Sequence, residues 1–115
     1  MTNETLQSWI DAAAAVPGVL ACGVRCADQS VLARSSYEEF SASKIEEVLR
    51  EIADVLRTLE QNRIAARRLR WTFEIGSLYA VALAGGALVA LLAGKSAASS
   101  PELERLLADV ARPDV

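Results

Sequence analysis

The stretch SLYAVALAGGALVALLAG, residues 77–94, decides the fold of this chain. It carries no charged side chain and is about as long as a helix that crosses a bilayer. The adjacent glycines Gly85 and Gly86 instead suit the two-residue turn of a β-hairpin, in which both residues need a positive φ. Such a turn pairs Val81 with Ala90 and leaves both faces of the strands apolar, as in central strands covered on both sides. The sequence therefore predicts a buried hairpin, with a membrane-associated segment as the alternative.

Three further strands precede this hairpin. Residues 67–75 alternate between apolar and polar side chains, which predicts a strand with one solvated face. Residues 19–26 and 31–36 are rich in strand-forming residues and are separated by the turn-like sequence 27–30. In the first of these two strands, one face carries residues small enough for a helix to approach closely.

Shorter helices are predicted near both ends of the chain. Apolar residues recur at helical spacing from Leu6 to Val16, and Pro17-Gly18 ends that helix. Near the C-terminus, Ser100 is expected to cap a helix that has Pro101 at its first position.

The longest helix is predicted over about Ser43–Gln61, with Ser43 and Glu46 forming a capping box at its start. Its apolar arc is wider than contact with one sheet requires, which suggests that it also packs on a second surface, such as a partner helix. The central stripe is Ile45, Leu49, Ile52 and Leu56, and the extra flank is Val48, Val55 and Leu59.

Composition narrows the functional classes. The 115 residues support one domain, 1–115, and the formal charge of −3 argues against nucleic acid as the main partner. The chain has no histidine, so histidine-dependent nucleophiles, bases and metal sites are ruled out. Cys22 and Cys26, on one predicted strand, are about 13 Å apart and are expected to be unbridged thiols of a reducing compartment. We expect no signal peptide, no metal, no cofactor and a cytoplasmic location.

Two further motifs, a glycine-lysine-serine sequence and an arginine cluster, are candidate binding sites. Gly94-Lys95-Ser96 resembles the end of a phosphate-binding loop, but the motif also needs a glycine at position 89, which is Val89. The basic cluster around the strand at 67–75 has two interpretations: a charged helix end followed by a solvated edge strand, or a docking surface for an acidic partner. Its members are Arg63, Arg67, Arg68 and Arg70.

The predicted order of elements is helix, two strands, long helix, three strands, helix, an α/β (α+β) fold, and in this order the chain resembles the roadblock / dynein light chain family. The likeness runs from about Leu6 to Val110. Its landmarks are Pro17-Gly18-Val19, the Asp28-containing turn, the segment 31–36, the Gly85-Gly86 hairpin, and a short last helix after a serine-rich loop. One departure is Gln29-Ser30, where the family often has a glycine.

This resemblance implies a five-stranded antiparallel sheet, with the long helix on one face and both terminal helices on the other. It also implies dimerisation through the long helices and the edge strand that follows them. The interface residues would be Val48, Ile52, Val55, Leu59, Arg68, Arg70 and Thr72, with Arg63 and Arg67 as docking residues for a further partner.

Family members are non-enzymatic regulators or scaffolds. The resemblance therefore implies a homodimer, or a dimer with a paralogous roadblock chain, that binds a small Ras-like GTPase or a signalling or motor complex. The alternative is a small-molecule-binding sensory domain, which would need a pocket with convergent polar groups. An enzyme is not expected, because Asp28, Glu38 and Glu39 are the only carboxylates near predicted strand ends and nothing converges on them.

Overall fold

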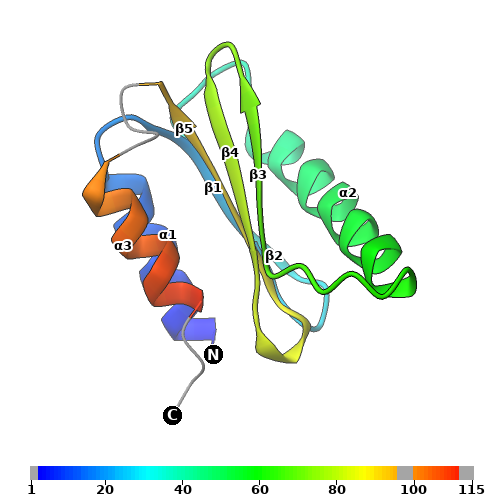
Figure 1. The fold of residues 1–115 in the computed structure, drawn as a ribbon. Helices are drawn as coiled ribbons and strands as arrows, with labels where there is room; N and C mark the ends of the chain where they lie inside the picture. The colour runs from blue at the N-terminus through cyan, green and yellow to red at the C-terminus, as the bar shows by residue number, and fades with distance from the viewer. Residues whose placement is uncertain (1–2, 96–99, 112–115) are drawn as a thin grey trace.

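Two helical layers enclose a central sheet in the computed structural model, which describes residues 3–95 and 100–111 (Figure 1). Helices α1 (Asn3–Ala15) and α3 (Pro101–Ala111) lie on one face of the sheet, and α2 (Ala42–Gln61) lies on the other. The predicted α+β class and the order α-β-β-α-β-β-β-α are confirmed.

The sheet has five strands in the order β2-β1-β5-β4-β3, and all neighbouring strands run antiparallel. The two strands of the apolar hairpin are therefore interior strands, as predicted, while β2 and β3 are the edges. The strands are β1 (Val19–Arg25), β2 (Val31–Ser35), β3 (Arg68–Phe73), β4 (Gly76–Ala82) and β5 (Leu88–Gly94).

The register of the β4–β5 hairpin differs from the prediction by one residue. Val81 pairs with Val89 rather than with Ala90. The connection is the three-residue turn η1 (Ala84–Gly86), closed by a hydrogen bond from the N–H of Leu83 to the carbonyl oxygen of Ala87. A one-residue slip exchanges the two faces of a strand, and polarity cannot fix the register here because both faces are apolar.

The β1–β2 turn is stabilised by Asp28. Its Oδ1 accepts hydrogen bonds from the N–H of Ser30 (3.0 Å) and from its Oγ (2.6 Å), and these bonds lower the pKa of the exposed Asp28 carboxyl. Gln29 adopts φ 74°, the left-handed conformation that a glycine takes most easily. The turn therefore forms without the glycine expected from the family resemblance.

The two faces of the sheet support separate cores. The face under α1 and α3 buries Tyr79, Val81, Val89 and Leu91 with Cys22, and neither Cys22 nor Cys26 is bridged. The opposite face buries Ala80, Ala90 and Leu92 against Ile45, Leu49 and Ile52 of α2. Gly23 lets α2 approach closely, since a Cβ added there would lie 2.5 Å from Cγ2 of Ile45.

Of the two predicted helix N-termini, one is wrong and one is confirmed. The predicted capping box is wrong: α2 begins at Ala42 after Ser41, so Ser43 lies inside the helix, and Ser41 makes no side-chain capping bond. The predicted cap of α3 is confirmed, because Oγ of Ser100 accepts the N–H of Leu103 at 3.2 Å. The serine-rich loop falls on 96–99, outside the described residues.

Within the described part of the chain, none of the helices has the length and apolar composition needed to span a membrane. The apolar stretch 77–94 instead forms β4, the turn and β5.

Candidate self-association surface

The large apolar side chains that remain exposed are gathered in one part of the chain. Among the described residues they are Val55, Ile64, Phe73 and Ile75, with exposed fractions of 41–53%. All four lie between the middle of α2 and the turn after β3. An exposed apolar patch of this kind is typical of a site where another protein binds.

The reason for this exposure is the position of β3 at the margin of both helical layers. Helix α2 packs mainly on β1, β2 and β5, and α3 packs on β4. Leu69 and Trp71, on the α2 side of β3, are consequently only half-buried. The other edge strand, β2, contacts both α1 and α2 and is the better covered of the two edges.

One flank of α2 is turned toward the same margin. Val48 lines a shallow hollow together with Leu78 of β4 and Leu92 of β5, so this flank points toward β4 rather than toward β2. About two helical turns beyond Val48, Val55 is exposed, and about three turns beyond it, Leu59 is half-buried. We call these residues, with those of β3 and its flanking loops, the α2–β3 surface: Val48, Val55, Leu59, Ile64, Leu69, Trp71, Phe73 and Ile75.

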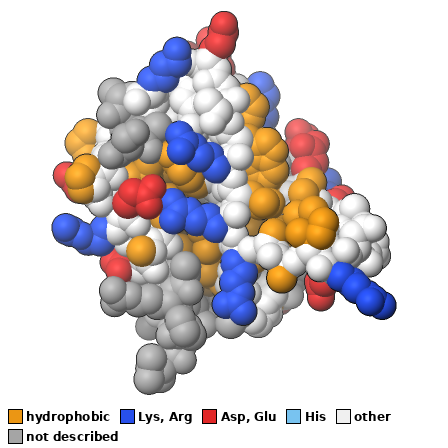
Figure 2. All heavy atoms as spheres, in the orientation of Figure 1, with side chains coloured by type: hydrophobic (Ala, Val, Ile, Leu, Met, Phe, Trp, Pro, Cys, Tyr) orange, Lys and Arg blue, Asp and Glu red, His pale blue; other side chains and the backbone are white. Residues whose placement is uncertain are grey.

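Figure 2 shows apolar side chains as a band between β3 and α2, with basic and acidic side chains on the other side of β3. Charged groups thus border the band on one side, and the helix borders it on the other. A band of apolar surface with a charged margin matches the general anatomy of protein–protein interfaces.

The structure divides the predicted interface residues into three groups. Ile52 is 3% exposed and packs in the core beneath α2, so its side chain is not on the outer surface. Val48, Val55 and Leu59 belong to the α2–β3 surface. Arg68, Arg70 and Thr72 are exposed on β3 but alternate with Leu69 and Trp71, which places them on the opposite face of the sheet. The second group and the third group thus lie on opposite faces of the sheet, and the open backbone edge of β3 lies between these faces.

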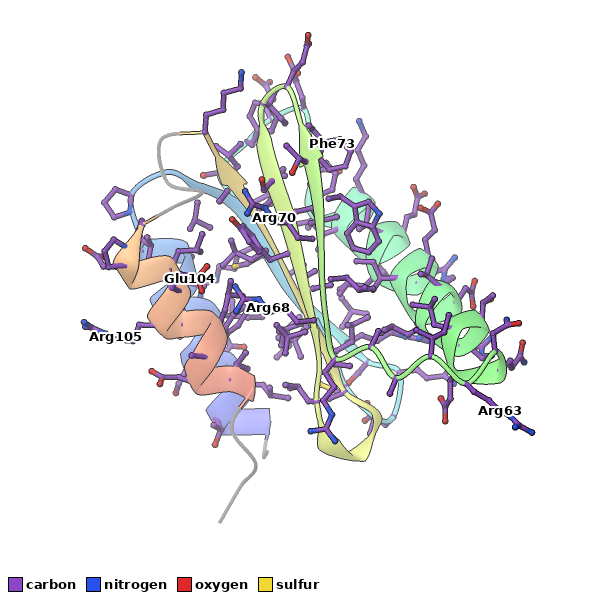
Figure 3. The ribbon with its side chains drawn as sticks, in the orientation of Figure 1. Arg63, Arg68, Arg70, Phe73, Glu104 and Arg105 are labelled. Atoms are coloured by element: carbon purple, nitrogen blue, oxygen red, sulfur yellow. The ribbon has the colours of Figure 1, made fainter. Side chains whose placement is uncertain are left out.

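Arg68 and Arg70 make defined contacts on that opposite face. Arg68 forms an ion pair with Glu104 of α3, with 3.0 Å between Nη2 and each carboxylate oxygen, and the two side chains point toward each other in Figure 3. Arg70 donates to Oγ of the buried Ser77 at 3.3 Å. Both guanidinium groups also lie over the ring of Tyr79, at 5.9 and 5.3 Å from its centre.

The two docking candidates, Arg63 and Arg67, are exposed in the connection between α2 and β3. Arg63 adopts a positive φ of 63° just after the helix, and its side chain extends away from the protein (Figure 3). Both precede β3 in the chain, whereas the guanidinium groups of Arg68 and Arg70 are engaged on the α3 side of the sheet.

Several surface residues were not predicted as interface residues: Ile64, Leu69, Trp71, Phe73 and Ile75. Alternation along the strand indicated that Leu69, Trp71, Phe73 and Ile75 share one face. It did not indicate that this face would be half-covered, because coverage depends on where α2 sits over the sheet.

The cavity beside α1 and the thiol of Cys22 are weaker candidates for a functional site. A cavity of about 200 Å³ lies between the end of α1 and strands β1 and β2, with Leu20, Cys22, Arg34 and Ser36 in its lining. It is smaller than the roughly 300 Å³ at which ligand pockets usually begin. Burial raises the pKa of the Cys22 thiol to about 11, so this thiol is a poor nucleophile at neutral pH.

The described residues offer few side chains that could hold a cofactor or a metal ion. No group of three or more cysteine, aspartate or glutamate side chains there is arranged to hold a metal ion. In a phosphate-binding loop, positions 89 and 94 would be the two glycines of the motif. Here Val89 and Gly94 both lie in strand β5, so this segment forms no such loop.

No protein-family model matches this chain, and no curated protein is significantly similar to it.

Proposed function

We propose that this chain forms a homodimer through the α2–β3 surface, and that the dimer is a non-enzymatic regulatory or scaffold module. Its partner would be a small Ras-like GTPase or a signalling or motor complex in the cytoplasm. The observation that carries the proposal is that the large exposed apolar side chains of the described residues, Val55, Ile64, Phe73 and Ile75, all fall between the middle of α2 and the turn that follows the open edge strand β3. A twofold interface there would cover the apolar side chains and the unpaired edge of β3 together.

The resemblance to the roadblock family supports the same surface. Members of that family join two sheets through the strand that follows the long helix, and β3 is that strand here. The exposed arginines of the α2–β3 connection, Arg63 and Arg67, lie at the end of this surface and would face an acidic region of the partner. A paralogous chain in place of the second copy would use the same edge.

Light scattering on the purified protein, coupled to size-exclusion chromatography, tests the dimer. We expect twice the mass of the chain at tens of micromolar for the wild type and a shift toward monomer for Val55→Glu, which would bury an unpaired carboxylate in the interface. Val55 is 41% exposed in the isolated chain, so the substitution should leave the fold intact. Ala12→Glu, the same kind of change at an exposed position of α1, is the matched control and should stay dimeric.

A wild type that is monomeric at these concentrations would overturn the homodimer. Partner choice needs a second experiment, in which the tagged dimer is used as bait in extracts of source cells containing GDP or a non-hydrolysable GTP analogue. Capture of a small GTPase that depends on the nucleotide would support the regulatory role, and its loss with Arg63→Glu/Arg67→Glu would support the docking residues. Equal capture with both nucleotides would contradict a nucleotide-sensing role.

A further inference from the structure

The open edge of β3 has a defined pattern of free backbone groups. The N–H of Ala82 donates to the carbonyl oxygen of Arg67 at 2.7 Å, so residues 67 and 82 form a hydrogen-bonded pair in the β3–β4 ladder. Such pairs alternate in an antiparallel ladder, which directs the backbone groups of Leu69, Trp71 and Phe73 toward β4. Arg68, Arg70 and Thr72 therefore present their N–H and C=O groups to the open edge.

A second copy that pairs antiparallel with this edge has few registers to choose from. The twofold axis must stand perpendicular to the sheet, so residues that face each other across the junction share one face. The possible centres near the middle of the strand are Leu69, Arg70, Trp71 and Thr72. Centres on Arg70 and Trp71 overlap five strand residues of each copy, whereas a centre on Leu69 or on Thr72 overlaps only three.

The side chains discriminate between the two longer registers. Centring on Arg70 sets that guanidinium opposite its own copy, and like charges directly opposite each other destabilise a strand pair. The same register leaves the half-exposed Phe73 opposite Arg67 of the second copy. Both features oppose a twofold axis at Arg70.

Centring on Trp71 removes both conflicts. It sets Arg70 opposite Thr72, Leu69 opposite Phe73 and Trp71 opposite Trp71 of the second copy. The tryptophan pair is of the non-hydrogen-bonded kind, in which side chains approach most closely and aromatic pairs are favourable. The apolar members of these pairs, Leu69, Trp71 and Phe73 of each copy, lie on the α2 side, where they continue the apolar band between β3 and α2 (Figure 2).

We propose that a second copy of this chain pairs its β3 with this β3 in the register centred on Trp71, so that Arg70 of each copy faces Thr72 of the other. The inference rests on the homodimer proposed above and specifies how its two sheets join. The two Trp71 rings then flank the twofold axis, on the face of the joined sheet that carries the two α2 helices. Phe73 of each copy is covered by Leu69 of the other.

Cysteine crosslinking tests the register with two exposed positions. In the proposed register, residues 70 and 72 of opposite copies form a hydrogen-bonded pair with Cα atoms about 5.5 Å apart, within disulfide range. Two residues 70, or two residues 72, are diagonal and beyond about 7 Å, where no bridge forms. The variants Arg70→Cys and Thr72→Cys are made separately and also co-produced with tags of different mass.

We expect a disulfide-linked dimer after mild oxidation only in the mixed sample, with a crosslinked peptide joining positions 70 and 72. Bridging of Arg70→Cys alone would place the axis at residue 70, and bridging of Thr72→Cys alone would place it at residue 72; either result overturns the proposal. Wild type, whose Cys22 and Cys26 are buried, and Ala12→Cys on α1 are the controls for random collision.

Light scattering on the same wild-type protein separates the two proposals. A dimer without the mixed crosslink would overturn the register and leave the homodimer standing. A monomer would overturn both.

Discussion

The guanidinium of Arg68 lies 3.0 Å from both carboxylate oxygens of Glu104, and this ion pair links the edge strand β3 to the last helix, 36 residues further along the chain. Both side chains are about half-exposed, at 42% and 54%. The contact therefore fixes the position of Arg68 without adding much to the free energy of unfolding, because water and salt screen an exposed pair.

The variant Glu104→Gln tests that assessment. We expect a loss of less than about 1 kcal/mol in the free energy of unfolding, measured with urea at low ionic strength, and almost none at high salt. Asp54→Asn, which removes the exposed i,i+3 pair with Arg57, should behave in the same way and serves as the control. A loss above about 2 kcal/mol for Glu104→Gln would mean that the pair holds α3 against the sheet.

Close approach of α2 to the sheet at Gly23 gives a second prediction. A Cβ at this position would lie 2.5 Å from Cγ2 of Ile45 and 3.1 Å from Cδ1 of Leu49, so Gly23→Ala should destabilise the fold by about 1–3 kcal/mol through overpacking. Urea unfolding of Gly23→Ala, Ile45→Ala and the double variant measures the coupling. Removal of the clashing methyl group should make the double variant more stable than the sum of the two losses predicts. Additive losses would show that the clash is not the cause.

The indole of Trp9 supports a third prediction. Its Nε1 donates to the carbonyl oxygen of Leu106 at 3.0 Å and so connects α1 to α3 across 97 residues. Trp9→Phe removes this donor and part of a buried ring, and should cost about 2–4 kcal/mol of unfolding free energy. Trp71→Phe is the control, because the Trp71 indole makes no hydrogen bond to the described residues and its ring is half-buried. Equal losses at low protein concentration would contradict a special role for the Trp9 contact.

Alkaline pH should weaken the fold through Cys22. Desolvation raises the pKa of this buried thiol from 9.0 to about 11, against a smaller opposing effect of Arg34, and Asp11 raises it slightly further. Because the folded state holds the proton more tightly, the stabilisation is complete below about pH 9 and is lost as the pH rises toward 11. Over that range the free energy of unfolding should fall by up to about 1.4 kcal/mol per pH unit more in the wild type than in Cys22→Ala. Parallel pH profiles of the two proteins would contradict this account.

Much of the fold follows from local patterns in the sequence. The alternation in residues 67–75, the helical spacing of Ile45, Leu49 and Ile52, and Ser100-Pro101 at the start of α3 each depend on neighbours within a few residues. The element order and the interior position of the hairpin strands were predictable for this reason.

The sequence predictions were wrong where two local arrangements suited the residues equally well. The hairpin register was wrong by one residue because either face of β4 and β5 is apolar, so that a third turn residue costs nothing in burial. The capping box was wrong because serines at 41 and 43 are both suitable N-cap residues, and the chain starts the helix after the first of them.

The sequence by itself determined which residues share a face: Val48 with Val55 and Leu59 on α2, and Leu69 with Trp71 on β3. Helical and strand periodicity are properties of the backbone and need no tertiary information. Only the tertiary structure decided that Ile52 is covered while Val55 and Phe73 are left exposed, because that depends on α2 lying over β1, β2 and β5 rather than over β3. The candidate interface thus results from where α2 lies on the sheet. The helix covers β1, β2 and β5, and the apolar face of β3 extends beyond it.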